Sequence, residues 1–260
     1  MKKLFFCLTF VSVVLFASLA HGFSQKTHSN SIGMEFVLIP AGKFTPEPIS
    51  HSVEKDRITV TISKPFYLGK YEVTQEQWVA VMGGSNPASF KGGTNPVENV
   101  SWNDAQEFIK RLNQKEGHNR YRLPTEAEWE HAARAGTQSD CFFGEGKETI
   151  TEADLAEYVW FSKNSGGKTH PVGQKKPNPW ALYDIYGNVW EWVQDGHSGK
   201  YYGDTAAAST DPFVPSGSDR VLRGGGWHDF AEVCSSVYRI GVTPDVRYYF
   251  IGFRLAFTPE

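Results

Sequence analysis

The sequence predicts a single α+β domain in which short helices and strands are connected by long irregular segments. Two capping-box patterns predict helix starts, and an alternation of polar and apolar residues over Arg57–Ile62 predicts a half-buried strand. From residue 137 onward, glycine, proline, asparagine, aspartate and aromatic residues dominate, with no long helical period. A chain of 260 residues, 40% hydrophobic and 14% aromatic, is large enough to bury one substantial core.

Composition sets the expected ends of the domain. Residues 1–22 combine Lys2 and Lys3 with an apolar run over Leu4–Leu19 and small residues near its end, which is the layout of a secretory signal peptide. Residues 23–31 are polar and predict a flexible lead, so the domain itself is expected to span residues 32–260. The apolar run is shorter than the roughly 20 residues that a membrane span requires. We therefore expect a periplasmic or secreted protein with no transmembrane span once the signal is removed.

Charge and cysteine content narrow the possible functions. The formal net charge is -3 without a run of like charges, which argues against nucleic-acid binding. Signal removal leaves Cys141 and Cys234, which an oxidising compartment allows to pair, but sequence does not fix their distance, so a disulfide and two free thiols both stay open. Neither a His-Glu-x-x-His pattern nor a paired Cys-x-x-Cys spacing is present to support a zinc or haem site.

Strands are expected mainly near the start of the domain. Met34–Pro40 and Arg57–Ile62 have strand patterns, and Thr45–Asp56 between them reads as a loop. In the second half only short strand-like runs occur, at Val221–Arg223 and Gly252–Phe257.

Helices are expected in the middle of the chain. Thr74 with Gln77, and Thr125 with Glu128, form capping boxes in which side chains satisfy the free amides of a helix start. Ser101 can cap another helix, because apolar residues recur after it at helical spacing. The predicted helices run from Thr74 to about Met82, from Ser101 to Gly117, and over roughly 125–135, with Gly136 at the end of the last.

A set of motifs spread over the chain carries a resemblance to a known family. The glycine-rich segment Arg220–Asp229 is followed by Cys234 and by Ile251–Leu255. The further motifs, in chain order, are Gly33–Phe44, Tyr71–Trp78, Asn95–Trp102, Tyr121–Glu130 and Tyr183–Trp192. From about Ile32 to Phe257 the chain thus resembles the formylglycine-generating enzymes, also called sulfatase-modifying factors. The resemblance implies that family's C-type-lectin-like fold, which has little regular secondary structure.

The resemblance also points to candidate catalytic residues. The aerobic enzymes of the family oxidise a sulfatase cysteine with a pair of cysteines that binds Cu(I). Alignment on the glycine motif places Cys234 on the second cysteine and Asp229 on the first, and Gly226 stands where active enzymes carry serine. A carboxylate is a hard ligand that does not replace a thiolate for Cu(I), so the copper-binding pair is incomplete. The glycine run can place Cys234 beside a groove, and a buried or idle thiol is the alternative.

Two kinds of function therefore stay open. One is an oxidase or tailoring enzyme that acts on a protein or a small periplasmic substrate, since some relatives tailor siderophores without the cysteine pair. The other is a non-catalytic lectin-like module that binds a protein or peptide. Its binding face would be built from Trp227, His228, Phe230, Tyr248 and Tyr249.

The resemblance further implies a calcium site. Asp184, Gly187, Val189 and Glu191 match the family positions that hold calcium, two through carboxylates and two through backbone carbonyls. Calcium takes six to eight oxygen ligands, and a glycine-bearing loop with carboxylates at both ends supplies several of them. The alternative is an ordinary loop with two solvated acids.

Residues around the glycine motif are candidates for a substrate groove. The groove candidates are Trp190, Trp227, His228 and Arg223. Burial in the core is the alternative for the tryptophans, and structural ion pairs with Asp229 and Glu191 are the alternative for Arg223 and Arg254. His228 and Asp229 would form an acid/base pair only if their segment is irregular, because adjacent residues of a strand point to opposite faces. The tryptophans expected in the core are Trp78, Trp102, Trp129 and Trp192.

Overall fold

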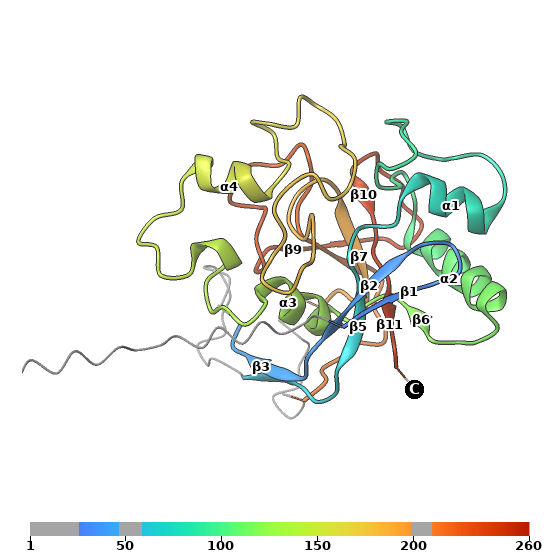
Figure 1. Cartoon of the computed structure of the whole chain (residues 1–260), viewed down its shortest axis with the longest axis horizontal. Helices are drawn as coiled ribbons and strands as arrows, with labels where there is room; N and C mark the ends of the chain where they lie inside the picture. The colour runs from blue at the N-terminus through green and yellow to red at the C-terminus, as the bar shows by residue number, and fades with distance from the viewer. Residues whose placement is uncertain (1–25, 47–58, 199–209, 260) are drawn as a thin grey trace, which may run out of the picture.

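A five-stranded antiparallel sheet joins the two ends of the domain. The computed structural model describes residues 26–46, 59–198 and 210–259, and Figure 1 shows the arrangement of their elements. The strand order in this sheet is β1-β2-β5-β11-β6, so the C-terminal β11 lies between β5 and β6. The strands are β1 (Thr27–Ser29), β2 (Glu35–Ile39), β5 (Phe66–Gly69), β11 (Ala256–Phe257) and β6 (Tyr121–Arg122).

A second sheet carries the motifs that define the candidate site. Its order is β10-β7-β8-β9, in which β10 runs parallel to β7 and the other pairs are antiparallel. Glu191 of β7 is therefore paired with Arg223 of β8 on one side and with Gly252 of β10 on the other. The strands are β10 (Ile251–Gly252), β7 (Trp190–Gly196), β8 (Arg220–Arg223) and β9 (Arg239–Val242), and a separate antiparallel pair is formed by β3 (Gly42–Phe44) and β4 (Val60–Ile62).

The helices begin at the capping residues that the sequence predicts. The side chains of Thr74, Ser101 and Thr125 each accept a hydrogen bond from the amide three residues later, and each box is closed by the returning side chain. Gly117 ends the second helix in the left-handed conformation, whereas Ala135, not Gly136, caps the third. The helices are α1 (Gln75–Met82), α2 (Trp102–Glu116), α3 (Glu126–Arg134) and α4 (Glu152–Tyr158), with a short 3-10 turn at Phe142–Gly144.

Two hydrophobic clusters fill the described part of the domain. One surrounds α3 and contains Trp129, and the other lies against α1 and α2 and contains Trp78 and Trp192. These three tryptophans are buried, as predicted. For Trp102 the prediction of a core position is wrong, because this side chain is only half-buried. Its indole donates a hydrogen bond to the carbonyl of Val193 and packs on the guanidinium of Arg220.

Other sequence expectations also differ from the structure. Part of the predicted flexible lead, Thr27–Ser29, is an edge strand paired with β2. Helix α4 was not predicted, although Thr151 and Asp154 form a capping box of the same type as the others. The signal segment 1–22, most of the loop over Thr45–Asp56 and the start of Arg57–Ile62 lie outside the described residues. No helix in the described ranges is long and apolar enough to cross a membrane.

Candidate functional site

The glycine motif turns tightly, and Asp229 holds the turn. The Asp229 amide donates to the carbonyl of Gly226 at 3.1 Å, and its carboxylate accepts from the Gly226 amide at 2.8 Å. The same carboxylate oxygen accepts from the indole of Trp190 at 2.7 Å. Asp229 thus acts as a local cap, and the hydrogen bonds that fix this turn already engage one of its carboxylate oxygens.

Cys234 lies beneath this turn, with 0% of its surface exposed. A Cβ atom on Gly225, whose φ is +77°, would lie 3.0 Å from its Sγ, so glycine allows the turn to cover the thiol. Burial, followed by the nearby Asp229 charge, raises the pKa of Cys234 well above its usual value. The thiolate is the reactive form of cysteine. In this arrangement Cys234 is a neutral, covered thiol, and the structure does not favour its role as a nucleophile.

Cys141 lies next to Cys234 but forms no disulfide with it. Both cysteines are free, and the Cys141 thiol donates a hydrogen bond to the Cys234 carbonyl at 3.6 Å. Burial raises the pKa of Cys141 to about 12. Of the two outcomes left open by the sequence, the structure has two free, buried thiols.

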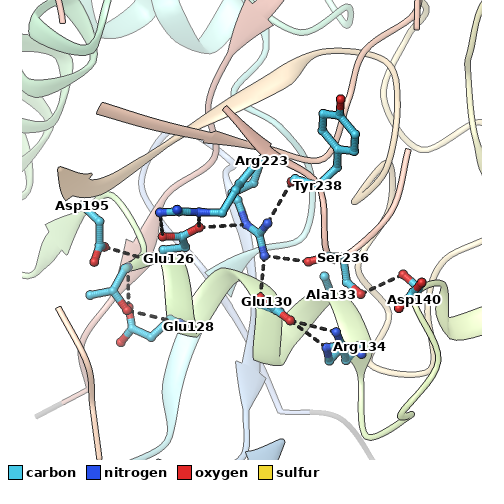
Figure 2. A network of polar contacts seen from close by, with 12 residues as sticks. Glu126, Glu128, Glu130, Ala133, Arg134, Asp140, Asp195, Arg223, Ser236 and Tyr238 are labelled. Carbon is cyan, nitrogen blue, oxygen red and sulfur yellow. Dashed lines mark hydrogen bonds and ion pairs between the residues drawn. The ribbon is translucent and has the colours of Figure 1, made fainter. Parts of the chain in front are cut away.

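Arg223 does not line a groove, because it is fully buried in an ion-pair network with helix α3 (Figure 2). Its guanidinium donates to Glu130 at 2.6 Å and lies 3.6 Å from Glu126. It also donates to the backbone carbonyls of Ser236 and Tyr238, at 2.6 and 2.8 Å. Arg223 therefore ties the segment after Cys234 to α3, which confirms the alternative of a structural ion pair but with different acids from those expected.

Arg254 contacts both ends of the predicted calcium loop, at Asp184 and at Glu191. Both oxygens of Glu191 accept hydrogen bonds from its guanidinium at 2.6–2.8 Å, and one also accepts from the Trp129 indole at 2.7 Å. The guanidinium donates further to the carbonyls of Tyr183 and Asp184, at 3.0 and 3.1 Å. A cationic side chain of the protein thus holds the start of the loop and its final carboxylate together.

In this arrangement protein groups already engage most of the carboxylate oxygens of the predicted calcium site. Asp184 is buried, with one carboxylate oxygen accepting from the Gly173 amide and the other without a partner. This second oxygen of Asp184 is the only carboxylate oxygen of Asp184 and Glu191 that has no hydrogen-bond partner, whereas calcium takes six to eight oxygen ligands. Among the described residues no group of three or more His, Cys, Asp or Glu side chains is placed to hold a metal. Calcium at Asp184, Gly187, Val189 and Glu191 stays a prediction.

Glu72 is a buried acid of this cluster that the sequence analysis missed. Its oxygens accept hydrogen bonds from the Asn188 side chain at 2.8 Å and from the Val189 amide at 3.2 Å. Burial, together with the charges of Asp184 and Glu191, raises its pKa well above the usual value. Burial also raises the pKa of Asp184 to about 6. Burial is the main cause of the raised pKa values, and the repulsion among three acids that share one guanidinium adds to it.

A continuous cluster of rings forms the surface beside the glycine motif. The members, called the aromatic face below, are Phe90, Trp227, His228, Tyr248, Tyr249 and Phe250. The indole of Trp227 packs edge-on against Phe90 at 5.3 Å and lies 5.8 Å from the Tyr249 ring. Tyr248 and Tyr249 are 44% and 46% exposed, and Phe230, in the loop that carries Trp227, is 70% exposed. Large contiguous apolar patches on a protein surface often mark binding sites.

The structure separates the predicted groove residues into two groups. Trp227 and His228 are partly exposed members of the aromatic face, whereas Trp190 is buried, with 3% of its surface exposed. His228 Nδ1 lies 3.7 Å from the Asp229 carboxylate and makes no hydrogen bond, so the two residues are adjacent but are not joined as an acid/base pair. Phe90 and Phe250 were not predicted as members of this surface, and for Phe90 no local pattern shows that the loop before α2 reaches the glycine motif.

The copper site of the oxidases has no counterpart in this geometry. Two-coordinate Cu(I) requires two soft ligands, and the position of the first cysteine holds Asp229, which is engaged with Trp190 and Gly226. The second position holds the covered thiol of Cys234. The residues present do not fit copper.

Comparison with known proteins decides the family. Residues 23–259 match the family described as Sulfatase-modifying factor enzyme 1-like domain. The chain belongs to the sulfatase-modifying factor family. This confirms the resemblance that the sequence motifs indicated.

Relatives within the sulfatase-modifying factor family differ in what they are named for. The chain is 33% identical over 264 residues to the chaperone protein LppX of Paenibacillus barcinonensis, which covers 82% of this chain and 86% of LppX. It is 35% identical over 174 residues to the formylglycine-generating enzyme of Streptomyces coelicolor, covering 62% of this chain and 52% of the enzyme. The chain therefore matches only about half the length of that enzyme.

Solved structures of the sulfatase-modifying factor family confirm the C-type-lectin-like fold. Treponema denticola variable protein 1 superposes with a TM-score of 0.76 at 36% identity, covering 91% of this chain and 99% of the other. PvdO from Pseudomonas aeruginosa superposes with a TM-score of 0.75 at 27% identity, covering 90% and 98%.

Proposed function

We propose that this member of the sulfatase-modifying factor family is a non-catalytic module that binds a protein ligand through its aromatic face. The observation that carries the proposal is a contrast between two neighbouring parts of the glycine motif. Cys234 is covered and neutral, while Trp227 and the rings around it are arranged at the surface. Redox or nucleophilic chemistry requires an accessible thiolate, whereas recognition requires accessible rings.

The aromatic face has the composition of a protein-binding surface. Tryptophan and tyrosine dominate the binding energy of many interfaces, because their rings bury a large area with little loss of conformational freedom. Trp227 is held in place by a hydrogen bond from its indole to the Tyr249 carbonyl at 3.3 Å and by its packing against Phe90. The rings are thus pre-positioned, which lowers the entropic cost of binding.

The relatives support a protein as the ligand. LppX, which covers most of this chain, is named a chaperone, and a chaperone acts by binding other proteins. We also propose that the domain works outside the cytoplasm as a periplasmic or secreted protein. The support for that location is the signal-peptide layout of residues 1–22.

Site-specific photo-cross-linking in the source organism tests the proposal. A benzophenone amino acid replaces Tyr248, and the expected result is one discrete cross-linked protein, identified by mass spectrometry. Trp227→Ala and Tyr249→Ala should each abolish it, because truncating a central interface ring costs about 2 kcal/mol or more, equal to a roughly thirtyfold weaker Kd. Phe213→Ala is the matched control, since Phe213 is 44% exposed and makes none of the ring contacts of the aromatic face.

Three results would overturn the proposal. The first is a cross-linked product that Phe213→Ala reduces as strongly as Trp227→Ala, and the second is the absence of any product. The third is catalysis, which is tested by incubating copper-loaded protein with a Cys-x-Pro-x-Arg peptide; we expect the peptide cysteine to keep its mass. Conversion of that cysteine to formylglycine would restore the oxidase alternative.

A further inference from the structure

A basic pocket opens directly beside the aromatic face. It has a volume of about 420 Å³ and is lined by two segments, called its two walls below, of which one contains Phe90 and Lys91 and the other Lys168 and His170. Phe90 belongs to both features, because its ring also packs against Trp227 at 5.3 Å and Tyr249 at 6.3 Å. A ligand that covers the aromatic face therefore meets this pocket at its edge.

The first wall of the pocket is held from beneath by buried polar side chains. The side-chain amide nitrogen of Gln75 donates to the Phe90 carbonyl at 2.8 Å, and the side-chain oxygen of Gln75 accepts from the Gly92 backbone amide at 3.0 Å. Glu98, which is fully buried, accepts from the Phe90 amide at 2.7 Å. These contacts fix the backbone that carries Phe90 and Lys91, so the pocket exists before a ligand arrives.

The second wall is fixed to the loop that leads into β7. The His170 amide donates to the Asn188 side chain at 3.0 Å, and the His170 ring stacks on Trp160 at 3.8 Å. Thr169 accepts a hydrogen bond from the Asn95 side chain at 3.3 Å, which ties the two walls together. Neither wall depends on the exposed lysines for its position.

The charge of the pocket is positive. Lys91 and Lys168 are exposed, no carboxylate lines the pocket, and neither lysine is in an ion pair within residues 26–46, 59–198 and 210–259. The Lys91 ammonium donates to the Asn86 carbonyl at 2.8 Å. Glu98 lies behind the wall, where burial raises its pKa and the charge of Lys91 acts in the opposite direction.

We infer that this pocket binds the carboxylate of an acidic side chain on the protein segment that covers the aromatic face. An ammonium that hydrogen-bonds a carboxylate makes a charge-assisted contact, stronger than a neutral one, and each of the two walls carries one such lysine. The proposal rests on the proposed function and adds the class of ligand to it: a segment in which an aromatic or apolar residue is followed closely by aspartate or glutamate.

Nuclear magnetic resonance titration of the purified ¹⁵N-labelled protein tests this inference. The probe is N-acetyl-glutamate α-amide, which carries one side-chain carboxylate, and its neutral counterpart is N-acetyl-glutamine α-amide. The glutamate probe should shift the amide signals of Ser89–Lys91 and Lys168–His170 in a saturable manner, and the glutamine probe should not. The double variant Lys91→Glu with Lys168→Glu should weaken binding at least tenfold, equal to about 1.4 kcal/mol.

Matched controls keep the test decisive. Lys43→Glu with Lys115→Glu makes the same change of charge at two exposed lysines outside the pocket. It should change the affinity for the glutamate probe by no more than a factor of about two to three, because salt screens interactions between distant surface charges. Equal shifts from the two probes, no shifts, or equal losses in both double variants would overturn the inference. So would inorganic phosphate binding at least tenfold more tightly than the glutamate probe, since the site would then serve another oxyanion.

The failure of this inference can be told apart from failure of the proposed function. The small probe does not need the aromatic face, and Tyr249→Ala should therefore retain probe binding while losing the cross-linked partner. If the probe does not bind but the aromatic substitutions still abolish cross-linking, only the carboxylate assignment falls.

Discussion

Replacing Glu191 with glutamine separates two roles for the loop that precedes β7. In the structure Glu191 is the partner of a fully buried guanidinium, and its exposed surface is 1%. If that ion pair is its role, Glu191→Gln destabilises the protein whether calcium is present or not. If Glu191 is instead a calcium ligand, the loss of stability appears only when calcium is bound.

The size of the effect follows from the contacts of Arg254. Removing one partner of a buried pair typically costs about 3–5 kcal/mol, because the remaining charge loses its compensation. Arg254 keeps its hydrogen bonds to the carbonyls of Gly69, Tyr183 and Asp184, and it stays near the charges of Glu72 and Asp184. We therefore expect the lower end, about 3 kcal/mol, which lowers the Tm of a domain of this size by about 6–12 °C.

Urea unfolding and thermal scans, each in excess calcium and in excess chelator, measure the two roles. Glu157→Gln is the control, because Glu157 forms a surface ion pair with Lys176 and should leave the Tm unchanged. The reasoning is refuted if Glu191→Gln matches the wild-type protein in chelator and falls below it only in calcium.

Three further outcomes test other parts of the structure. Burial, followed by repulsion from Glu126, raises the pKa of Asp195 to about 7, so the folded protein keeps a proton that the unfolded chain releases near pH 4. The free energy of unfolding should therefore fall as the pH rises from about 4 to 7, and Asp195→Asn should flatten that dependence in urea titrations. Cys141 and Cys234 should resist a thiol reagent at about pH 8 until the protein unfolds, and immediate labelling of the folded protein would contradict their burial. Gly187→Ala should prevent folding or lower the Tm far more than Gly166→Ala, because both have positive φ but only the first would place a Cβ 2.3 Å from a backbone carbonyl; equal shifts would disprove that steric argument.

Sequence patterns were sufficient where local chemistry decides the structure. The capping residues Thr74, Ser101 and Thr125 fixed the starts of three helices, because a helix start needs side-chain acceptors within three residues. The family motifs predicted the fold. A capping box is also present at Thr151, but helix α4 was not predicted there, because the surrounding segment lacks an apolar helical period.

The site was less predictable, because it depends on which distant segments meet. The sequence left Cys234 either beside a groove or buried and idle, and only the three-dimensional turn of the glycine motif shows that it is covered. Phe90 is 137 residues from Trp227, yet the two rings pack together. Arg223 was expected to pair with Asp229 or Glu191, but its partners are Glu126 and Glu130 on helix α3.

The position of β11 sets the order in which this domain can be completed. Ala256 and Phe257 pair with β5 on one side and with β6 on the other, and β6 has no other partner among the described strands of the first sheet. A nascent chain that has not yet reached residue 256 therefore has no strand to hold β6 in this sheet, although β1, β2 and β5 can already pair.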